Sequence, residues 1–317
     1  NGYGFVGPWR VQNSGGGTTS PESPLQGLIK SHNTTQASMA SNIGLCAIAD
    51  AAKEMGYHNA ISNASDIYSA NSFQPPMTIG TVQASPLTMA NVYATMGANG
   101  VECTPIAITK VTDRSGSKVK VPSANCHQAI DQDIAQTVSY ALNQGVVQPG
   151  GEASTTQLDN NRKTFAKTGT NENTVMTTAG FVPNQVAAFV AVADAQDPIN
   201  NTFDNKTING VYRPSWYGMY IATPAWKQFM NTYLAAINAP IDNDYGKGAD
   251  KYTVSKGATR TYNQYQYQRQ QNSQQQSQQQ TNQGQQQTNQ GQQQTNQGQQ
   301  QQSQQQPAEQ QSGQQHQ

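Results

Sequence analysis

Residues 164–193 read Thr-Phe-Ala-Lys-Thr-Gly-Thr-Asn-Glu-Asn-Thr-Val-Met-Thr-Thr-Ala-Gly-Phe-Val-Pro-Asn-Gln-Val-Ala-Ala-Phe-Val-Ala-Val-Ala. Three apolar and β-branched runs in this stretch, Thr164–Lys167, Val175–Val182 and Val186–Ala193, predict three β-strands. Pro183 and Asn184 form a turn between the last two runs. Connections this short join antiparallel strands, so the stretch predicts a small antiparallel sheet.

Helical patterns surround this predicted sheet. Apolar residues at helical spacing, together with Ser, Asn, Asp and Pro at the starts, predict helices over 23–30, 33–55, 85–96, 131–143 and 223–236. A hairpin is predicted between Ile106 and Val121, and residues 145–162 and 194–215 read as loops. Helices followed by a small sheet and a final helix indicate an α+β fold rather than repeated βαβ units.

Composition narrows the class of protein. The 317 residues carry 18 Lys and Arg against 18 Asp and Glu, so the net charge is zero and nucleic-acid binding is disfavoured. Charged residues make up 11% of the chain, compared with roughly 25% in an ordinary domain. A surface made mainly of Asn, Gln, Ser, Thr and Tyr is typical of an exported protein. No apolar run reaches the ~18 residues of a membrane helix.

The apolar residues are distributed unevenly along the chain. The stretch 265–317 contains 31 Gln in 53 residues and three copies of Thr-Asn-Gln-Gly-Gln-Gln-Gln. None of its repeat positions is apolar, so we expect a disordered tail, although Gln-rich tracts can also self-associate. We therefore expect a domain over 1–240, an extension over 241–264 and a Gln-rich tail over 265–317.

Two short motifs could carry chemistry. Lys167-Thr168-Gly169-Thr170 lies at a predicted strand, where an ammonium and hydroxyls beside a Gly can meet a carboxylate. Ser31-His32-Asn33 lies between two predicted helices, where a hydroxyl and an amide can face a cleft. Each motif also has an ordinary explanation. The first could be a solvent-facing turn, and the second a helix N-cap.

Together and in this order, the motifs resemble the Ser-x-Asn and Lys-Thr-Gly motifs of the penicillin-recognising serine enzymes. Around them, residues 1–240 resemble class A penicillin-binding proteins, which are bifunctional peptidoglycan glycosyltransferases and transpeptidases. The blocks that carry the resemblance are 27–34, 85–101, 165–170, 180–183 and 223–230. The resemblance implies a penicillin-binding, β-lactamase-like transpeptidase fold, in which an antiparallel sheet packs with helices beside an all-helical lobe.

The resemblance also implies roles for individual residues. Ser31 would move a proton between nucleophile and leaving group, Asn33 would hold the acylated peptide, and Lys167 would supply positive charge. Thr168 and Thr170, flanking Gly169, would bind a terminal carboxylate, with the Thr170 N–H in an oxyanion hole. The implied substrates are the D-Ala-D-Ala ends of peptidoglycan stem peptides, and β-lactams would be covalent inhibitors.

The sequence departs from the family at the nucleophile. The family motif Ser-x-x-Lys precedes Ser-x-Asn, and residues 1–30 do not contain it. A match at 115–118 lies in the predicted hairpin turn and is interpreted as coincidence. After Lys-Thr-Gly-Thr, Val175–Thr178 replaces the acidic and aromatic residues of many relatives. We interpret the chain as the C-terminal part of a transpeptidase domain that cannot acylate alone. An upstream glycosyltransferase domain and membrane anchor would place it at the outer face of the cytoplasmic membrane, in the cell wall.

Two other functions stay open. One is a hydrolase of the same superfamily, either a D,D-carboxypeptidase or a β-lactamase. The other is a non-catalytic cell-wall scaffold that keeps the fold without a nucleophile. The four His show no metal spacing, so neither a metal nor another cofactor is expected. Cys103 and Cys126 flank the predicted hairpin and would form a disulfide if the protein is extracellular; otherwise they are two unpaired small residues.

Overall fold

The computed structural model describes residues 9–16, 22–60, 67–68, 73–198, 200–249 and 252. The chain divides into two units, residues 1–253 and 254–317, and all described residues belong to the first unit. The predicted Gln-rich tail therefore lies outside the described residues. Among the described residues, no helix has the length and apolar character needed to cross a bilayer.

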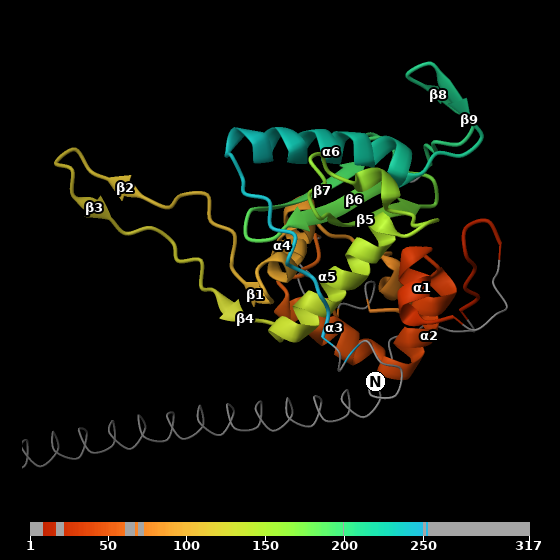
Figure 1. Cartoon of the computed structure of the whole chain (residues 1–317), viewed down its shortest axis with the longest axis horizontal. Helices are drawn as coiled ribbons and strands as arrows, with labels where there is room; N and C mark the ends of the chain where they lie inside the picture. Colours follow the sequence, from red (N-terminus) through yellow and green to blue (C-terminus); the bar gives the residue numbers. More distant parts are fainter. Residues whose placement is uncertain are drawn as a thin grey trace, which may run out of the picture. The chain divides into compact units, whose positions relative to one another are not determined.

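A three-stranded antiparallel sheet lies at the centre of the described unit (Figure 1). Its strands are β5 (Phe165–Asn171), β6 (Val175–Val182) and β7 (Val186–Val192), hydrogen-bonded in that order. This sheet confirms the three strands predicted from residues 164–193, although β5 continues through the Lys-Thr-Gly motif.

Helices cover both faces of this sheet, so the unit has three layers (Figure 1). On one face lie α4 (Pro86–Gly97) and α5 (Gln132–Val147). On the other face lies α6 (Gly218–Ala236), which contacts all three strands. The structure is thus α+β, as expected.

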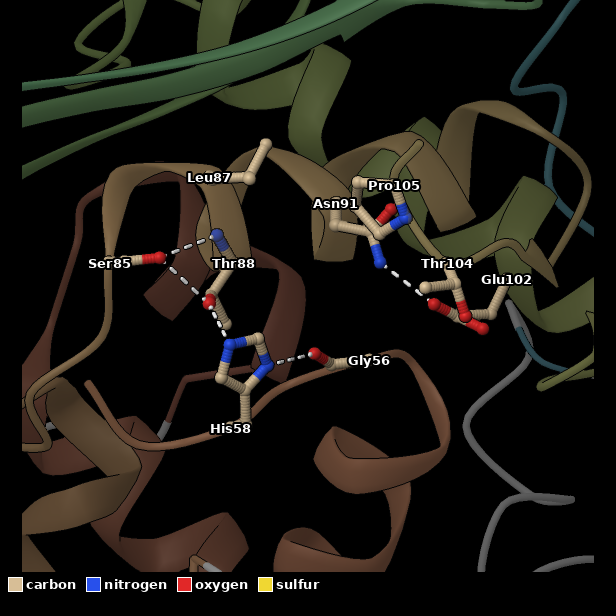
Figure 2. Close-up of a pocket in the computed structure, with 9 residues that line it drawn as sticks. All are labelled: Gly56, His58, Ser85, Leu87, Thr88, Asn91, Glu102, Thr104 and Pro105. Atoms are coloured by element: carbon tan, nitrogen blue, oxygen red, sulfur yellow. Dashed lines mark hydrogen bonds between the residues drawn. The ribbon is translucent and has the colours of Figure 1, made fainter. Parts of the chain in front are cut away.

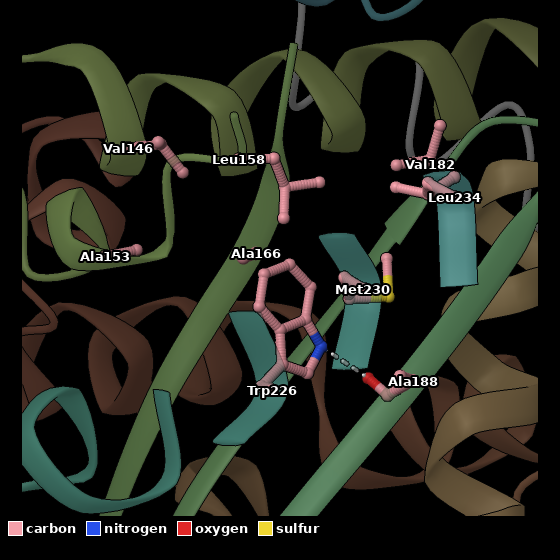
Figure 3. Packing of buried hydrophobic residues seen from close by; sticks show 9 residues of the cluster. All are labelled: Val146, Ala153, Leu158, Ala166, Val182, Ala188, Trp226, Met230 and Leu234. Atoms are coloured by element: carbon pink, nitrogen blue, oxygen red, sulfur yellow. Dashed lines mark hydrogen bonds between the residues drawn. The ribbon is translucent and has the colours of Figure 1, made fainter. Parts of the chain in front are cut away.

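Trp226 of α6 anchors the core between α6 and the sheet (Figure 3). Its side chain has no solvent-exposed surface, and its indole N–H donates to the Ala188 carbonyl at 3.0 Å. This hydrogen bond satisfies the indole N–H, which would otherwise be buried without a partner. The buried residues of this cluster are Val146, Ala153, Leu158, Ala166, Val182, Ala188, Trp226, Met230 and Leu234.

A second core cluster lies on the other side of the sheet. The rings of Phe165 and Phe181 stack with their centroids 5.0 Å apart, and Tyr245 meets Phe165 edge-on at 5.7 Å. The Tyr245 hydroxyl accepts from the Asn99 backbone N–H at 3.2 Å and donates to the Met96 carbonyl. The segment that follows α6 therefore returns to the sheet, where Tyr245 fills a position in the core.

The first part of the unit is helical: α1 (Pro24–Ile29), α2 (Asn33–Ile43) and α3 (Leu45–Glu54), with 3-10 turn η1 (Pro75–Ile79). The single helix predicted over 33–55 is wrong, because Gly44 separates α2 from α3. Gly44 has φ +89° and ψ 141°, a conformation outside the helical region that Gly adopts readily.

Two short hairpins complete the unit. The first consists of β2 (Val111–Thr112) and β3 (Lys118–Val119). It lies between β1 (Val101–Glu102) and β4 (His127–Gln128), which pair with each other. Cys103 and Cys126 form a disulfide bond at its base. The second hairpin, β8 (Lys206–Ile208) with β9 (Val211–Arg213), lies within residues 194–215.

The loop expected over 194–215 is therefore wrong at the β8–β9 hairpin. Asn209 and Gly210 turn this hairpin with positive φ values of 50° and 78°, a type of turn that favours hairpins. The loop predicted over 145–162 also contains the 3-10 turn η2 (Ser154–Thr156). Helix α6 begins at Gly218, before the predicted start at residue 223, and contains Pro224.

Candidate active site

Ser31 lies at the C-terminal end of α1 in a left-handed conformation, with φ +56°. The Ser31 N–H donates to the Leu28 carbonyl at 3.2 Å, and the His32 N–H donates to the Gly27 carbonyl at 2.8 Å. These two hydrogen bonds form a Schellman motif, in which the left-handed position is usually Gly. A side chain there costs about 1–2 kcal/mol, and strain of this kind is concentrated at functional sites.

Lys167 reaches Ser31 from the sheet. Its Nζ atom donates to Ser31 Oγ at 2.6 Å and to the Thr168 carbonyl at 2.7 Å. The two residues are 136 positions apart in the sequence, so the fold alone brings them together. Burial lowers the pKa of Lys167 from 10.5 to about 8, and the Glu152 carboxylate partly opposes this shift. With this pKa, the Lys167 ammonium can give up a proton, and the neutral amine can take one back, near neutral pH.

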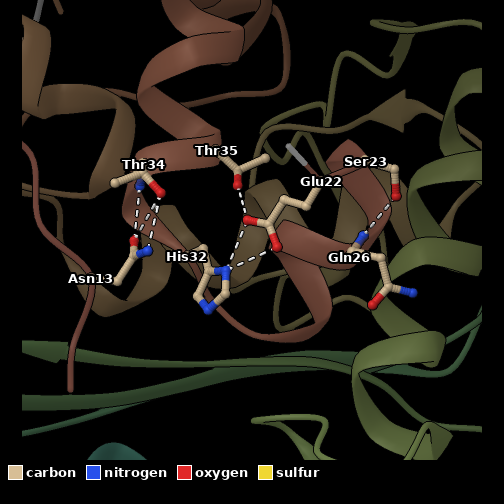
Figure 4. Close-up of polar contacts among 7 residues, drawn as sticks. All are labelled: Asn13, Glu22, Ser23, Gln26, His32, Thr34 and Thr35. Atoms are coloured by element: carbon tan, nitrogen blue, oxygen red, sulfur yellow. Dashed lines mark hydrogen bonds and ion pairs between the residues drawn. The ribbon is translucent and has the colours of Figure 1, made fainter. Parts of the chain in front are cut away.

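Glu22 holds the start of α2 from one side (Figure 4). Its carboxylate accepts hydrogen bonds from the Thr35 hydroxyl and from His32 Nδ1, which lies 2.8 Å from Oε1. The hydrogen bond from Thr35, followed by that from His32, lowers the pKa of Glu22. Glu22 therefore fixes two side chains that follow the Ser31 turn, and His32 points to Glu22.

Asn13 and Gln12 hold the same helix end from the other side. The Asn13 side-chain oxygen accepts from the Thr34 N–H at 3.0 Å and thus satisfies a free N–H in the first turn of α2 (Figure 4). Asn33 Nδ2 donates to the Gln12 carbonyl at 2.9 Å. The Asn33 amide nitrogen therefore already donates to a backbone carbonyl, whereas the Ser31 hydroxyl oxygen accepts from the Lys167 side chain.

Gln12, Asn13 and Glu22 were missed by the sequence reasoning, which read residues 1–22 as a loop. A Glu or an Asn in an irregular segment carries no local signal for a contact ten or twenty residues away. The one signal available was the Glu immediately before the Ser23 N-cap, and it fits many helix starts equally well.

The Thr-Gly-Thr residues continue the edge of the sheet beyond Lys167. Thr168 Oγ1 donates to the Glu152 carbonyl at 3.2 Å, and Thr170 Oγ1 accepts from the Gly218 N–H at 3.1 Å. A Cβ atom on Gly169 would lie 2.3 Å from Thr177 Oγ1 on β6, so a side chain at residue 169 would require the Thr177 side chain to move. The hydrogen bond from Gly218 ties the start of α6 to β5, which explains why α6 begins before the predicted residue 223.

A cleft of about 610 Å³ lies over the sheet, where residues of β5, β6 and β7 line it. Gly169, Thr170 and Asn171 contribute one wall, and Met77 and Met89 are among the apolar residues opposite. This volume lies within the roughly 300–1,000 Å³ typical of ligand pockets. The site thus combines a serine–lysine contact, a strand with hydroxyl side chains and a largely apolar cleft beside that strand.

A second hollow of about 350 Å³ lies between α4 and the base of the first hairpin (Figure 2). His58 Nε2 lies 2.8 Å from Thr88 Oγ1, and Asn91 donates to the Glu102 carboxylate at 2.8 Å. These polar side chains bond to one another, and none of the predicted site residues lines this hollow. Within the described residues, no group of three or more His, Cys, Asp or Glu could hold a metal ion.

A helical lobe that supplies a strained serine to a lysine on the edge of an antiparallel sheet defines a domain of the transpeptidase class. The family model described as "Penicillin binding protein transpeptidase domain" matches residues 2–230. The chain therefore belongs to the penicillin-binding protein transpeptidase family.

Curated relatives agree with this family. Penicillin-binding protein 1A of Mycolicibacterium smegmatis is 26% identical over 240 residues, which cover 71% of this chain and 28% of that protein. Penicillin-binding protein 1A of Neisseria meningitidis (serogroup A) is 27% identical over 235 residues, or 71% of this chain and 26% of that protein. The chain spans about a quarter of the length of these relatives.

Solved structures show the same fold. The PonA1 protein from Mycobacterium tuberculosis in complex with penicillin V superimposes with a TM-score of 0.64 at 20% identity, covering 76% of this chain and 63% of that chain. Penicillin-binding protein 1A from Haemophilus influenzae superimposes with a TM-score of 0.59 at 19% identity, covering 74% of this chain and 37% of that chain. These likenesses confirm the expected penicillin-binding fold.

Proposed function

We propose that this chain forms the substrate-binding and proton-transfer half of a serine D,D-transpeptidase that cross-links peptidoglycan stem peptides ending in D-Ala-D-Ala. The observation that carries the proposal is the 2.6 Å contact between Lys167 Nζ and Ser31 Oγ. It joins the two motifs at one point, and it leaves the Ser31 hydroxyl proton free to point elsewhere.

In the proposed reaction, a serine nucleophile attacks the carbonyl carbon of the penultimate D-alanine. Its proton passes through Ser31 Oγ to the nitrogen of the departing D-alanine, while an ester bond forms and the peptide bond breaks. Lys167 holds Ser31 in place and adjusts its proton affinity. An amine of a second stem peptide then displaces the ester and returns the proton by the same route.

The remaining motif residues suit the terminal carboxylate of the substrate. Thr170 can offer its hydroxyl proton, Thr168 can do so once its hydroxyl leaves the Glu152 carbonyl, and the Lys167 ammonium gives the region positive charge. Asn33 would hold the amide of the acylated peptide, which requires its nitrogen to leave the Gln12 carbonyl or its oxygen to make the contact. The Thr170 N–H would contribute half of an oxyanion hole.

The proposal requires a nucleophile, and residues 1–30 lack the Ser-x-x-Lys motif that would supply it. The match at Ser115–Lys118 overlaps a second Ser-x-x-Lys at Ser117–Lys120, and both lie at the exposed turn of the first hairpin. We propose that a further segment of the same protein supplies the nucleophile. That protein would also contain a glycosyltransferase domain and a membrane anchor, which would place the site at the outer face of the cytoplasmic membrane. β-Lactams would then acylate that protein.

Binding and chemistry can be tested separately on this chain. Calorimetric titration with a peptide ending in D-Ala-D-Ala should show binding that weakens in a Thr168→Val/Thr170→Val variant and persists in the control Thr207→Val on β8. Intact mass spectrometry after incubation with penicillin V should show no adduct. An adduct on Ser115 or Ser117 would overturn the assignment of the nucleophile.

A non-catalytic scaffold is the second candidate, and the engaged amide of Asn33 is the observation that favours it. In that case the peptide would bind no better than an L-Ala-L-Ala control, and joining a segment with Ser-x-x-Lys would not restore acylation. A hydrolase of the same superfamily would instead release acylated penicillin rapidly after the segment is joined.

A further inference from the structure

The hairpin that contains β2 and β3 extends away from the three-layered body as an arm, defined here as residues 104–125 (Figure 1). The disulfide between Cys103 and Cys126 closes its base. Within the described residues, β2 and β3 pair with each other, and no other helix or strand packs extensively against them. The arm therefore adds little to the core.

The pairing of β2 with β3 gives the arm two chemically different faces. Val111 lies opposite Val119, so their side chains share one face, and the two residues are 37% and 46% exposed. Successive side chains of a strand point to opposite faces. Lys118, which precedes Val119 in β3, therefore points to the other face, and Lys110 and Lys120 lie next to the strand ends, beside Val111 and Val119. All three lysines are exposed.

The charge on the arm is unbalanced. It carries Lys110, Arg114, Lys118 and Lys120 against the single carboxylate of Asp113, although the whole chain has a net charge of zero. The Asp113 carboxylate accepts from the Ser115 and Ser117 N–H groups, both at 2.9 Å, so it is used to close the turn. Like charges gathered on one short hairpin repel one another, and an anionic partner would relieve this repulsion.

We propose that the arm docks on the surface of an anionic phospholipid bilayer, with its valine face towards the acyl chains and its lysines among the headgroups. Amphipathic elements with a cationic face bind membranes by burying apolar area and by attraction to anionic lipids. A soluble polyanion would attract the lysines but would leave Val111 and Val119 exposed to water. The choice of a membrane as the partner rests on the proposed function, which places the protein at the outer face of the cytoplasmic membrane.

Flotation of the complete chain with lipid vesicles tests this inference. The chain should bind vesicles that contain phosphatidylglycerol and not vesicles of phosphatidylcholine alone. Replacing the three lysines with alanine should weaken binding about 100-fold, since each cation contributes roughly fivefold. The matched control removes three lysines elsewhere, Lys206, Lys227 and Lys247, and should bind within about twofold of the parent because its charges lie off the arm.

A Val111→Ser/Val119→Ser variant separates a bilayer from a soluble polyanion. It should lose at least about fivefold in vesicle binding and bind inorganic polyphosphate as the parent does. The inference is overturned if the parent fails to bind anionic vesicles at low salt, if the control variant loses as much as the arm variant, or if the valine variant keeps full vesicle binding. Equal melting temperatures among the variants would show that folding is intact. Peptide binding is measured independently, so failure here leaves the proposed function standing.

Discussion

Raising the pH from 7 to 10 should stabilise the native protein more than its Lys167→Met variant. Burial lowers the pKa of Lys167 to about 8 in the folded protein, whereas the unfolded chain keeps the ordinary value of 10.5. Between these two values the unfolded state binds a proton that the folded state does not, so stability rises with pH. Below pH 8 both states are protonated, and the folded protein carries the full penalty of a desolvated ammonium.

The size of the effect follows from the two pKa values. Integrating the difference in bound protons from pH 7 to pH 10 gives about 2–3 kcal/mol, which is most of the effect of the whole shift. This is an upper value, because the side chain is partly exposed and solvent screens its charge. Methionine keeps a similar length and cannot titrate, so its variant should lack this part of the pH dependence.

Urea unfolding of both proteins at a series of pH values measures the effect. The quantity of interest is the rise in unfolding free energy of the native protein minus the rise in the variant. Burial raises the pKa of both Tyr57 and Tyr93 to about 12, which destabilises the fold above pH 10, but both proteins contain them. A difference below about 0.5 kcal/mol, within ordinary extrapolation error, would refute the claim that Lys167 is desolvated against Ser31.

Three further perturbations test the fold around the site. Ser31→Gly should be about 1 kcal/mol more stable than Ser31→Ala in denaturant unfolding, since both lose the hydroxyl and only Ala keeps the left-handed strain; equal stabilities would show that this conformation is absent in solution. Trp226→Ala should cost about 3–5 kcal/mol, while Phe229→Ala on the same helix, where the ring is 49% exposed, should change stability by at most about 1 kcal/mol; similar losses in the two variants would contradict the assigned core. Replacing Cys103 and Cys126 with serine should lower the melting temperature, with a loss of up to about 3 kcal/mol for a closed loop of this size, and an unchanged melting temperature would show that the arm is uncoupled from global unfolding.

Local patterns predicted much of the fold. The runs after Thr164 indicated the strands of the central sheet, because β-branched and aromatic residues between turn signals suit a pleated, buried surface. Ser85-Pro86 indicated the start of α4, and the structure shows the Ser85 hydroxyl accepting from the Thr88 N–H at 3.1 Å. Errors arose where one residue changed the chain direction, as Gly44 does between α2 and α3.

Some features of the candidate site could likewise be predicted from the sequence, and others could not. Motif order was sufficient to select Ser31 and Lys167 as candidates and to indicate the family. Long-range contacts determine the 2.6 Å distance between Lys167 Nζ and Ser31 Oγ. They also determine the lowered pKa of Lys167 and the strain at Ser31. No short window of sequence contains Glu22, Gln12 and Asn13 together with the residues that they hold.

The sequence by itself therefore determined the classes of element, the family and the residues with reactive groups, because local propensity and motif spacing are written in short stretches. Only the tertiary structure decided which groups touch. It set Lys167 against Ser31, engaged the Asn33 amide with Gln12 and returned Tyr245 to the core beside Phe165. These outcomes depend on how helices and sheet pack around shared apolar surface, and that packing is settled by the whole domain at once.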